Sequence, residues 1–156
     1  MSIEGVVKMA GFFSLLFGSK EEREQQRQIK KAQEQTDRET IRNSAKTQAL
    51  VDTIIQTFKN REFDEYFYNK QLYYNYIWLI VSKDGVWFNA WFKQAEFHLQ
   101  TIWIIKFEQL GWQRLKSNAM SDELTKIIVE EIKESGYEIV YDNDQIKIYP
   151  PKLQKW

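Results

Sequence analysis

The sequence contains no cysteine. Disulfide bonds, thiol catalysis and metal sites with cysteine ligands are therefore excluded, and this composition is typical of a cytoplasmic protein. Proline and glycine are scarce, with two and six residues, so we expect long regular elements and few long loops. No apolar run reaches the roughly 18 residues that a membrane-spanning helix needs.

The chain also lacks a net charge, because 22 basic residues balance 22 acidic ones. It therefore lacks the overall positive field of a typical nucleic-acid-binding protein. It has no glycine-rich phosphate loop, no dinucleotide fingerprint and no HExxH pair. The single histidine, His98, and the acidic residues Glu62, Asp64 and Glu65 are expected to be structural or solvated. We therefore assign no catalytic, metal-binding or cofactor-binding residue and do not expect an enzyme.

Residues 1–18 are almost entirely apolar and have no basic leader or cleavage pattern typical of a secretory signal. Plotted as a helix, they form a wide apolar face opposite a narrow strip, which suits a helix lying in a membrane interface or against a partner. We therefore predict an amphipathic attachment helix. Its expected membrane or partner contacts are Val6, Met9, Phe12, Phe13, Leu16 and Phe17.

Residues 19–48 change abruptly to charged and amide side chains that favour helix. We predict a charged helical spacer, with a disordered linker as the alternative. Basic residues follow one flank of this helix, which would favour an anionic membrane surface beside the attachment helix. These residues are Arg23, Arg27, Lys30, Lys31, Arg38, Arg42 and Lys46.

Residues 49–156 carry the pattern of an α+β domain. Apolar residues between about 40 and 60 recur at helical spacing, and the following segments are rich in β-branched and aromatic residues, which favours strands. Several of these strands are apolar on both faces. We therefore expect a mainly antiparallel sheet that is covered by helices on one face and by a partner on the other.

Turn signals divide this domain. Residues 82–85 predict a hairpin in which Gly85 takes a positive φ, and a turn at Gly111 is expected to lead into a fourth strand. Ser121 is the predicted N-cap of a C-terminal helix that ends at Ser135 and Gly136. A β-hairpin follows and ends at the two prolines.

The tract from residue 66 to residue 76 is rich in tyrosine. Its rings could stack on bases or sugars, but Lys70 is the only cation inside the tract, so core or interface packing is the favoured reading. The possible interaction surface consists of Tyr66, Tyr68, Tyr73, Tyr74 and Tyr76.

The leading hypothesis is a non-enzymatic adaptor or assembly protein on the cytoplasmic face of a membrane. It would attach through residues 1–18 and recruit a protein partner through its α+β domain. The alternative is a homo-oligomeric structural subunit whose N-terminal helices bundle together. A third hypothesis, binding of single-stranded nucleic acid through the tyrosines, is disfavoured by the charge balance.

Overall fold

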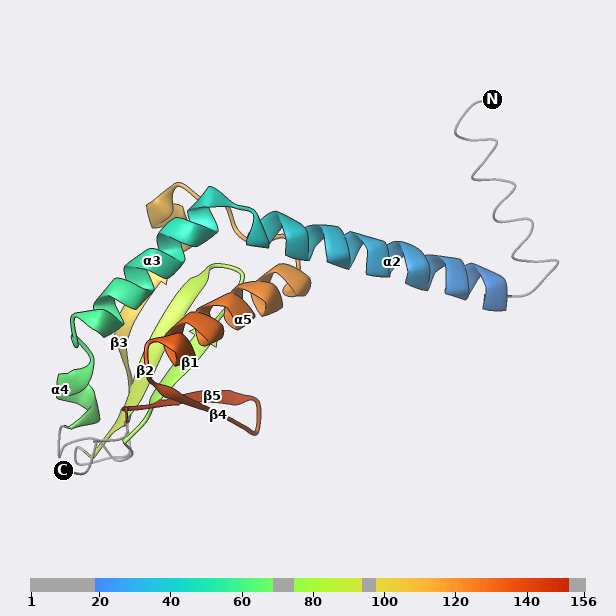
Figure 1. The fold of residues 1–156 in the computed structure, drawn as a ribbon. Helices are drawn as coiled ribbons and strands as arrows, with labels where there is room; N and C mark the ends of the chain where they lie inside the picture. Colours follow the sequence, from blue (N-terminus) through green and yellow to red (C-terminus); the bar gives the residue numbers. More distant parts are fainter. Residues whose placement is uncertain (1–18, 69–74, 94–97, 152–156) are drawn as a thin grey trace.

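The computed structural model describes residues 19–68, 75–93 and 98–151 (Figure 1). It confirms the predicted α+β class. The helices are α2 (Ser19–Arg42), α3 (Ala45–Lys59), α4 (Asp64–Phe67), the 3₁₀ turn η1 (Phe107–Leu110) and α5 (Asn118–Glu134), and the strands are β1 (Ile77–Val81), β2 (Gly85–Phe92), β3 (His98–Lys106), β4 (Glu138–Asp142) and β5 (Gln145–Tyr149).

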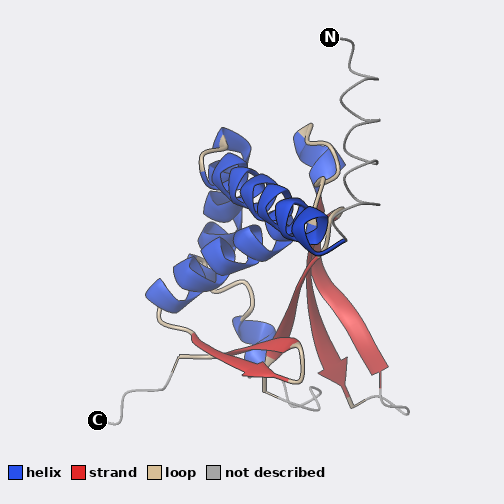
Figure 2. Cartoon of the chain, turned by 90° about the vertical axis from the view of Figure 1, so that its right-hand side faces the viewer, coloured by secondary structure: helices blue, strands red, loops and turns tan. Residues whose placement is uncertain are grey.

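The five strands form one antiparallel sheet in the order β3-β2-β1-β5-β4. Strand β1 lies at the centre and joins the hairpin β4–β5 at the end of the chain to the two other early strands, β2 and β3. Figure 2 shows the long helices gathered on one side of this sheet. We call the side that they cover the inner face and the opposite side the outer face.

The core lies between the inner face and the helices. Alternate residues of the central strands, such as Leu79 and Phe88, are buried against apolar residues of α3 and α5. The Phe58 ring lies 5.6 Å from the ring of Phe88 and 4.8 Å from that of Tyr137, measured between centroids. The Tyr137 hydroxyl also donates a hydrogen bond of 3.3 Å to the carbonyl of Phe58. These contacts fix the end of α3 beside the start of the last hairpin.

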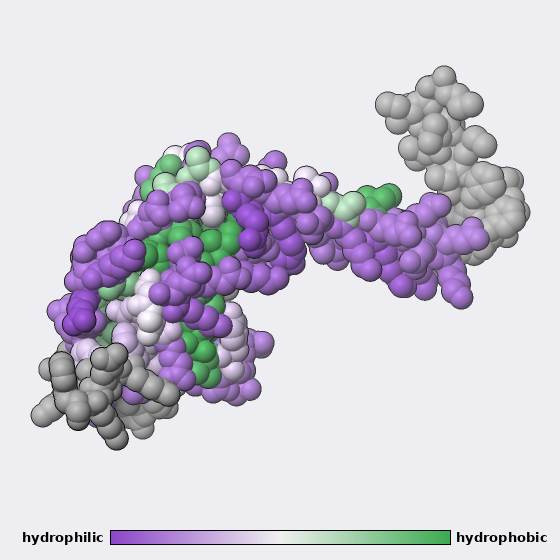
Figure 3. All heavy atoms as spheres, in the orientation of Figure 1, coloured by the Kyte–Doolittle hydropathy of each residue, from purple (hydrophilic) through white to green (hydrophobic). Residues whose placement is uncertain are grey.

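Helix α2 divides into two parts. Its C-terminal part packs on α5, and Ile41 is fully buried there. The part before Asp37 projects beyond the body (Figure 1), and Figure 3 shows that its visible surface is hydrophilic apart from one small apolar patch. Helix α2 ends at Arg42. Ser44 is the N-cap of the next helix, α3, because its hydroxyl accepts a hydrogen bond from the backbone amide of Lys46.

Several sequence predictions are confirmed. The apolar segment at 101–105 lies in a strand, and α5 ends at Glu134 with Ser135 as its C-cap and Gly136 at a φ of 100°. The last hairpin turns at Asn143 and Asp144, both of which have a positive φ. That conformation is the one a two-residue hairpin loop with the natural strand twist requires.

The predicted fourth strand after Gly111 is wrong. Gly111 does turn the chain, with a φ of 69°, but residues 112–117 then run as a loop. The amide of Leu115 donates a single bond of 2.9 Å to the carbonyl of Lys83 in the first hairpin turn. The loop is thus hydrogen-bonded to the turn of the β1–β2 hairpin and does not add a strand to the sheet.

Two finer predictions are also wrong. Ser117, not Ser121, is the N-cap of α5, because its hydroxyl accepts a bond of 3.3 Å from the amide of Met120. Gly85 is not among the residues with a positive φ. It is required for space, since a Cβ there would lie 2.4 Å from the carbonyl oxygen of Ile105 on the neighbouring strand.

Candidate binding surface

The outer face of the sheet is an aromatic surface that no helix of the described ranges covers (Figure 2). Because successive strand residues point to opposite sides, the neighbours of the inner core residues face outward. All of the large outward side chains on β1 and β2 are half-buried. We define the outer face by Trp78 and Ile80 on β1, Trp87, Asn89 and Trp91 on β2, and Thr101 and Ile104 on β3.

A polar pair lies at the centre of the outer face. Asn89 is only 5% exposed, and its side-chain oxygen accepts a bond of 2.6 Å from the hydroxyl of Thr101. Trp78 on β1 lies directly opposite Asn89 on β2. Trp87 and Trp91 lie on β2 as well, two positions before and two positions after Asn89. A buried amide needs such a partner, since an unpaired one costs about 1–3 kcal/mol. The side-chain oxygen of Asn89 is therefore satisfied within the chain, between tryptophan neighbours in the ladder.

One end of the outer face opens into a cleft of about 540 Å³ that Tyr76, Trp91 and Tyr149 help to line. The ammonium group of Lys147 lies 2.8 Å from the carboxylate of Asp142 and 4.8 Å from the centre of the Tyr76 ring. The hydrogen bond to Asp142 raises the pKa of Lys147. This cation is thus already neutralised within its own chain.

The opposite end has a similar composition. A cleft of about 360 Å³ is lined by Trp87, Trp112 and Phe107 together with four charged residues. These are Asp84, Lys106, Glu108 and Arg114. Arg114 lies 3.1 Å from the carboxylate of Asp84 at its margin. The outer face therefore has tryptophan and isoleucine side chains around one internal polar pair, with charged residues at both ends, and a charged rim is usual in a protein interface.

The predicted tyrosine surface is distributed over two sides of the molecule. Tyr66 is half-buried on α4, where it packs against the core, and Tyr68 is exposed beside it. Tyr76 is buried at the margin of the outer face, with its ring 5.7 Å from that of Tyr149. Tyr73 and Tyr74 lie outside the described residues. The described tyrosines are therefore not brought together on one surface.

The outer tryptophans escaped prediction as site residues. Their signal is the spacing of two between Trp87, Asn89 and Trp91, which places all three on one face of a strand. The apolar character of both strand faces was visible in the sequence. Which strands lie side by side depends on the pairing of β1 with β5, and that pairing joins segments about 70 residues apart.

The basic residues of the predicted flank have two different environments. Arg23, Arg27, Lys30 and Lys31 are exposed on the projecting part of α2. Arg38 and Arg42 instead share the carboxylate of Glu123 on α5, with a distance of 3.5 Å from Arg38.

Lys46 belongs to α3, where its ammonium group donates a bond of 2.8 Å to the carbonyl of Gly111.

Burial alone would raise the pKa of Glu123, but the hydrogen bonds and charges of Arg42 and Arg38 outweigh it and lower the pKa.

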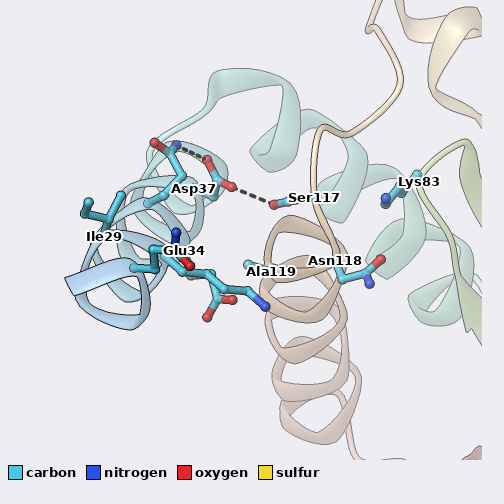
Figure 4. Close-up of a pocket in the computed structure, with 10 residues that line it drawn as sticks. Ile29, Glu34, Asp37, Lys83, Ser117, Asn118 and Ala119 are labelled. Carbon is cyan, nitrogen blue, oxygen red and sulfur yellow. Dashed lines mark hydrogen bonds between the residues drawn. The ribbon is translucent and has the colours of Figure 1, made fainter. Parts of the chain in front are cut away.

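A further hollow of about 640 Å³ lies where α2 departs from α5 (Figure 4). Asp37 lines it and accepts bonds of 2.7 Å from the hydroxyl of Ser117 and 3.0 Å from the side chain of Gln33. These bonds, with that from Ser117 the stronger, lower the pKa of Asp37. The hollow lies where α2 separates from α5, and Ile29, which also lines it, is 69% exposed.

The predicted attachment residues Val6, Met9, Phe12, Phe13, Leu16 and Phe17 all lie outside the described residues. Within the described ranges, no helix combines the length and apolar character that crossing a membrane would require.

Within the described residues, His98 and the acidic residues near Asp64 lie on different elements. His98 is exposed at the start of β3, and Asp64 lies 4.0 Å from Arg61 at the start of α4. In the part of the chain that the structure describes, no three histidine or acidic side chains are grouped so that they could hold a metal ion. Comparisons with family models, with curated proteins and with solved structures find no match to this chain.

Proposed function

We propose that this chain is a non-enzymatic adaptor or assembly protein that binds a protein surface through the outer face of its sheet. The observation that supports this proposal is the apolar patch formed by Trp78, Trp87 and Ile104, which no described helix covers. Tryptophan is strongly enriched among the residues that dominate binding energy at protein interfaces. A contiguous aromatic patch on a sheet is therefore best explained as a docking surface.

The charges around this face favour a protein over a nucleic acid. Lys147 and Arg114, which lie at its two ends, are paired with Asp142 and Asp84. Neither cation is free to neutralise a phosphate, and phosphate contacts supply most of the affinity for nucleic acids.

The proposal includes attachment to the cytoplasmic face of a membrane through residues 1–18, with α2 as the connection. The basic residues that remain exposed on the projecting part of α2, such as Arg23 and Lys30, support it because each well-placed cation contributes about 1 kcal/mol at an anionic surface. Nearby acids such as Glu24, which lies 3.7 Å from Arg27, reduce this attraction.

Sedimentation with vesicles containing one third phosphatidylserine tests the attachment. The full chain is expected to sediment with the vesicles, and Phe12→Asp combined with Phe13→Asp is expected to remain in the supernatant. The variant Ile104→Lys, altered on the outer face, serves as the matched control and should sediment like the parent. Equal recovery of the parent and the phenylalanine variant in the supernatant would contradict membrane attachment.

Photo-crosslinking in the cell tests the docking surface. A photoreactive amino acid at Ile104, which is 42% exposed, is expected to form discrete protein adducts. The same group at Gln48, exposed on α3, is the control position and should form few. Similar adduct patterns from both positions would show that the outer face has no special role.

A further inference from the structure

We infer that the outer face docks against the outer face of a second copy of this chain, giving a two-fold symmetric dimer with its sheets packed face to face. This inference rests on the proposed role of the outer face as a protein-binding surface and names its occupant. The argument uses the size of the face, its charge and the position of its polar groups.

The size of the outer face matches what a specific dimer needs. Strands are spaced about 4.8 Å apart and rise about 3.4 Å per residue, so the five strands, with 5, 8, 9, 5 and 5 residues from β1 to β5, present a face of about 520 Å². Packing two such faces would bury about 1,000 Å² in total, which reaches the roughly 1,000 Å² expected of a biological interface. The tryptophans would then fill the space of about 10 Å that separates stacked sheets.

The charges of the outer face permit self-association. In a two-fold interface each patch meets its own copy, so any uncompensated charge near the axis would meet a like charge. The centre of the face holds no charged residue, and Lys147 and Arg114 are paired with Asp142 and Asp84 in the same chain. Lys106 lies at one end of the face, in the cleft that Asp84 and Glu108 also line. The whole chain also has a formal net charge of zero. Two copies can therefore approach without repulsion.

The side-chain oxygen of Asn89 needs no hydrogen-bond donor from the partner. The hydroxyl of Thr101 already satisfies the side-chain carbonyl oxygen of Asn89, which is only 5% exposed. A different protein would need no particular hydrogen-bonding group here, and neither does an identical face. Apolar rings opposite apolar rings are sufficient.

Sedimentation equilibrium of the purified full chain tests the inference across a concentration series. The parent is expected to reach twice its mass of 18.8 kDa at high concentration. Ile104→Lys should weaken the dimer at least about tenfold, as expected when a charge enters an interface centre. Trp87→Ala gives a second test on the central strand, and circular dichroism establishes that each variant is folded.

Two control variants separate the outer face from the other apolar surfaces. Ile29→Lys alters the exposed isoleucine of α2, and Phe12→Asp alters the segment expected to attach to membranes. Both should dimerise like the parent. Loss of the dimer in Phe12→Asp with no effect of Ile104→Lys would show that the copies associate through their N-terminal segments and would overturn the inference.

The remaining outcomes separate this inference from the proposed function. A parent that is monomeric throughout the series would overturn the dimer, and crosslinks from Ile104 to a different protein would then preserve the adaptor role. Crosslinks from Ile104 that double the mass of the chain would support both. Salt-sensitive binding of a labelled oligonucleotide that Trp87→Ala abolishes would assign the face to nucleic acid and would contradict both.

Discussion

Replacing Glu123 with glutamine removes the negative charge that α5 shares with two arginines of α2. The Glu123 side chain is 7% exposed, whereas Arg38 is 29% and Arg42 is 56% exposed. Breaking a fully buried ion pair costs about 3–5 kcal/mol, and an exposed pair contributes at most about 1 kcal/mol. Since the arginines reach water, we expect Glu123→Gln to lower the free energy of unfolding by about 1–2 kcal/mol. Urea unfolding at pH 7, followed by circular dichroism, measures this loss.

The same variant makes a prediction about pH. The pKa of Glu123 in the folded chain lies below its ordinary value of 4.5, because the arginines outweigh the effect of burial. Because the folded pKa is lowered, the ionised Glu123 side chain stabilises the parent fully at pH values above the ordinary pKa. This contribution is lost as the pH falls through the folded pKa. The difference between parent and variant should therefore be largest at neutral pH and shrink below pH 4.5.

Glu134→Gln is the matched control, because it makes the same change at an exposed position of the same helix. It should alter stability by less than about 0.5 kcal/mol. If Glu123→Gln behaves like this control, or if its difference from the parent is constant with pH, the arginine pair does not hold α2 on α5 as described.

Three smaller changes test other contacts, each by thermal and urea unfolding. Gly85→Ala should destabilise the chain by about 1–3 kcal/mol, because its Cβ would overlap a backbone oxygen of β3, and a neutral result would refute the close approach. Ser117→Ala should cost about 1–2 kcal/mol through the lost cap, whereas Ser121→Ala should be nearly neutral because that buried hydroxyl has no hydrogen-bond partner. Thr101→Val should cost about 1–3 kcal/mol by leaving the buried oxygen of Asn89 unpaired, and unchanged stability would mean that water reaches it.

Local signals predicted the elements better than their ends. Asn143 and Asp144 are residue types that tolerate a positive φ, so the last hairpin could be predicted from a few neighbouring positions. Ser117 and Ser121 are both plausible caps in the sequence. The hydrogen bond to Asp37, 80 positions away, favours Ser117 in the fold, and no local pattern contains that information.

The loop after Gly111 failed prediction for a similar reason. Its apolar residues, including Leu115, match a strand pattern, yet its backbone bonds to the remote hairpin turn at Lys83. The aromatic character of the outer face was predictable from alternation along β2. Its position as an uncovered layer depends on all the helices packing on the inner face, which is a property of the whole fold.

The projecting part of α2 sets a distance as well as a connection. From Ser19 to Asp37 it extends about 27 Å at 1.5 Å per residue, and a flexible chain of equal length would average about 24 Å while fluctuating widely. Electrostatic forces in physiological salt decay over about 8 Å. If residues 1–18 rest on an anionic membrane as proposed, this rod holds the sheet several screening lengths away. The acidic side chains of the body then feel no repulsion from the lipid, and the tryptophan layer stays clear of the headgroups and open to protein.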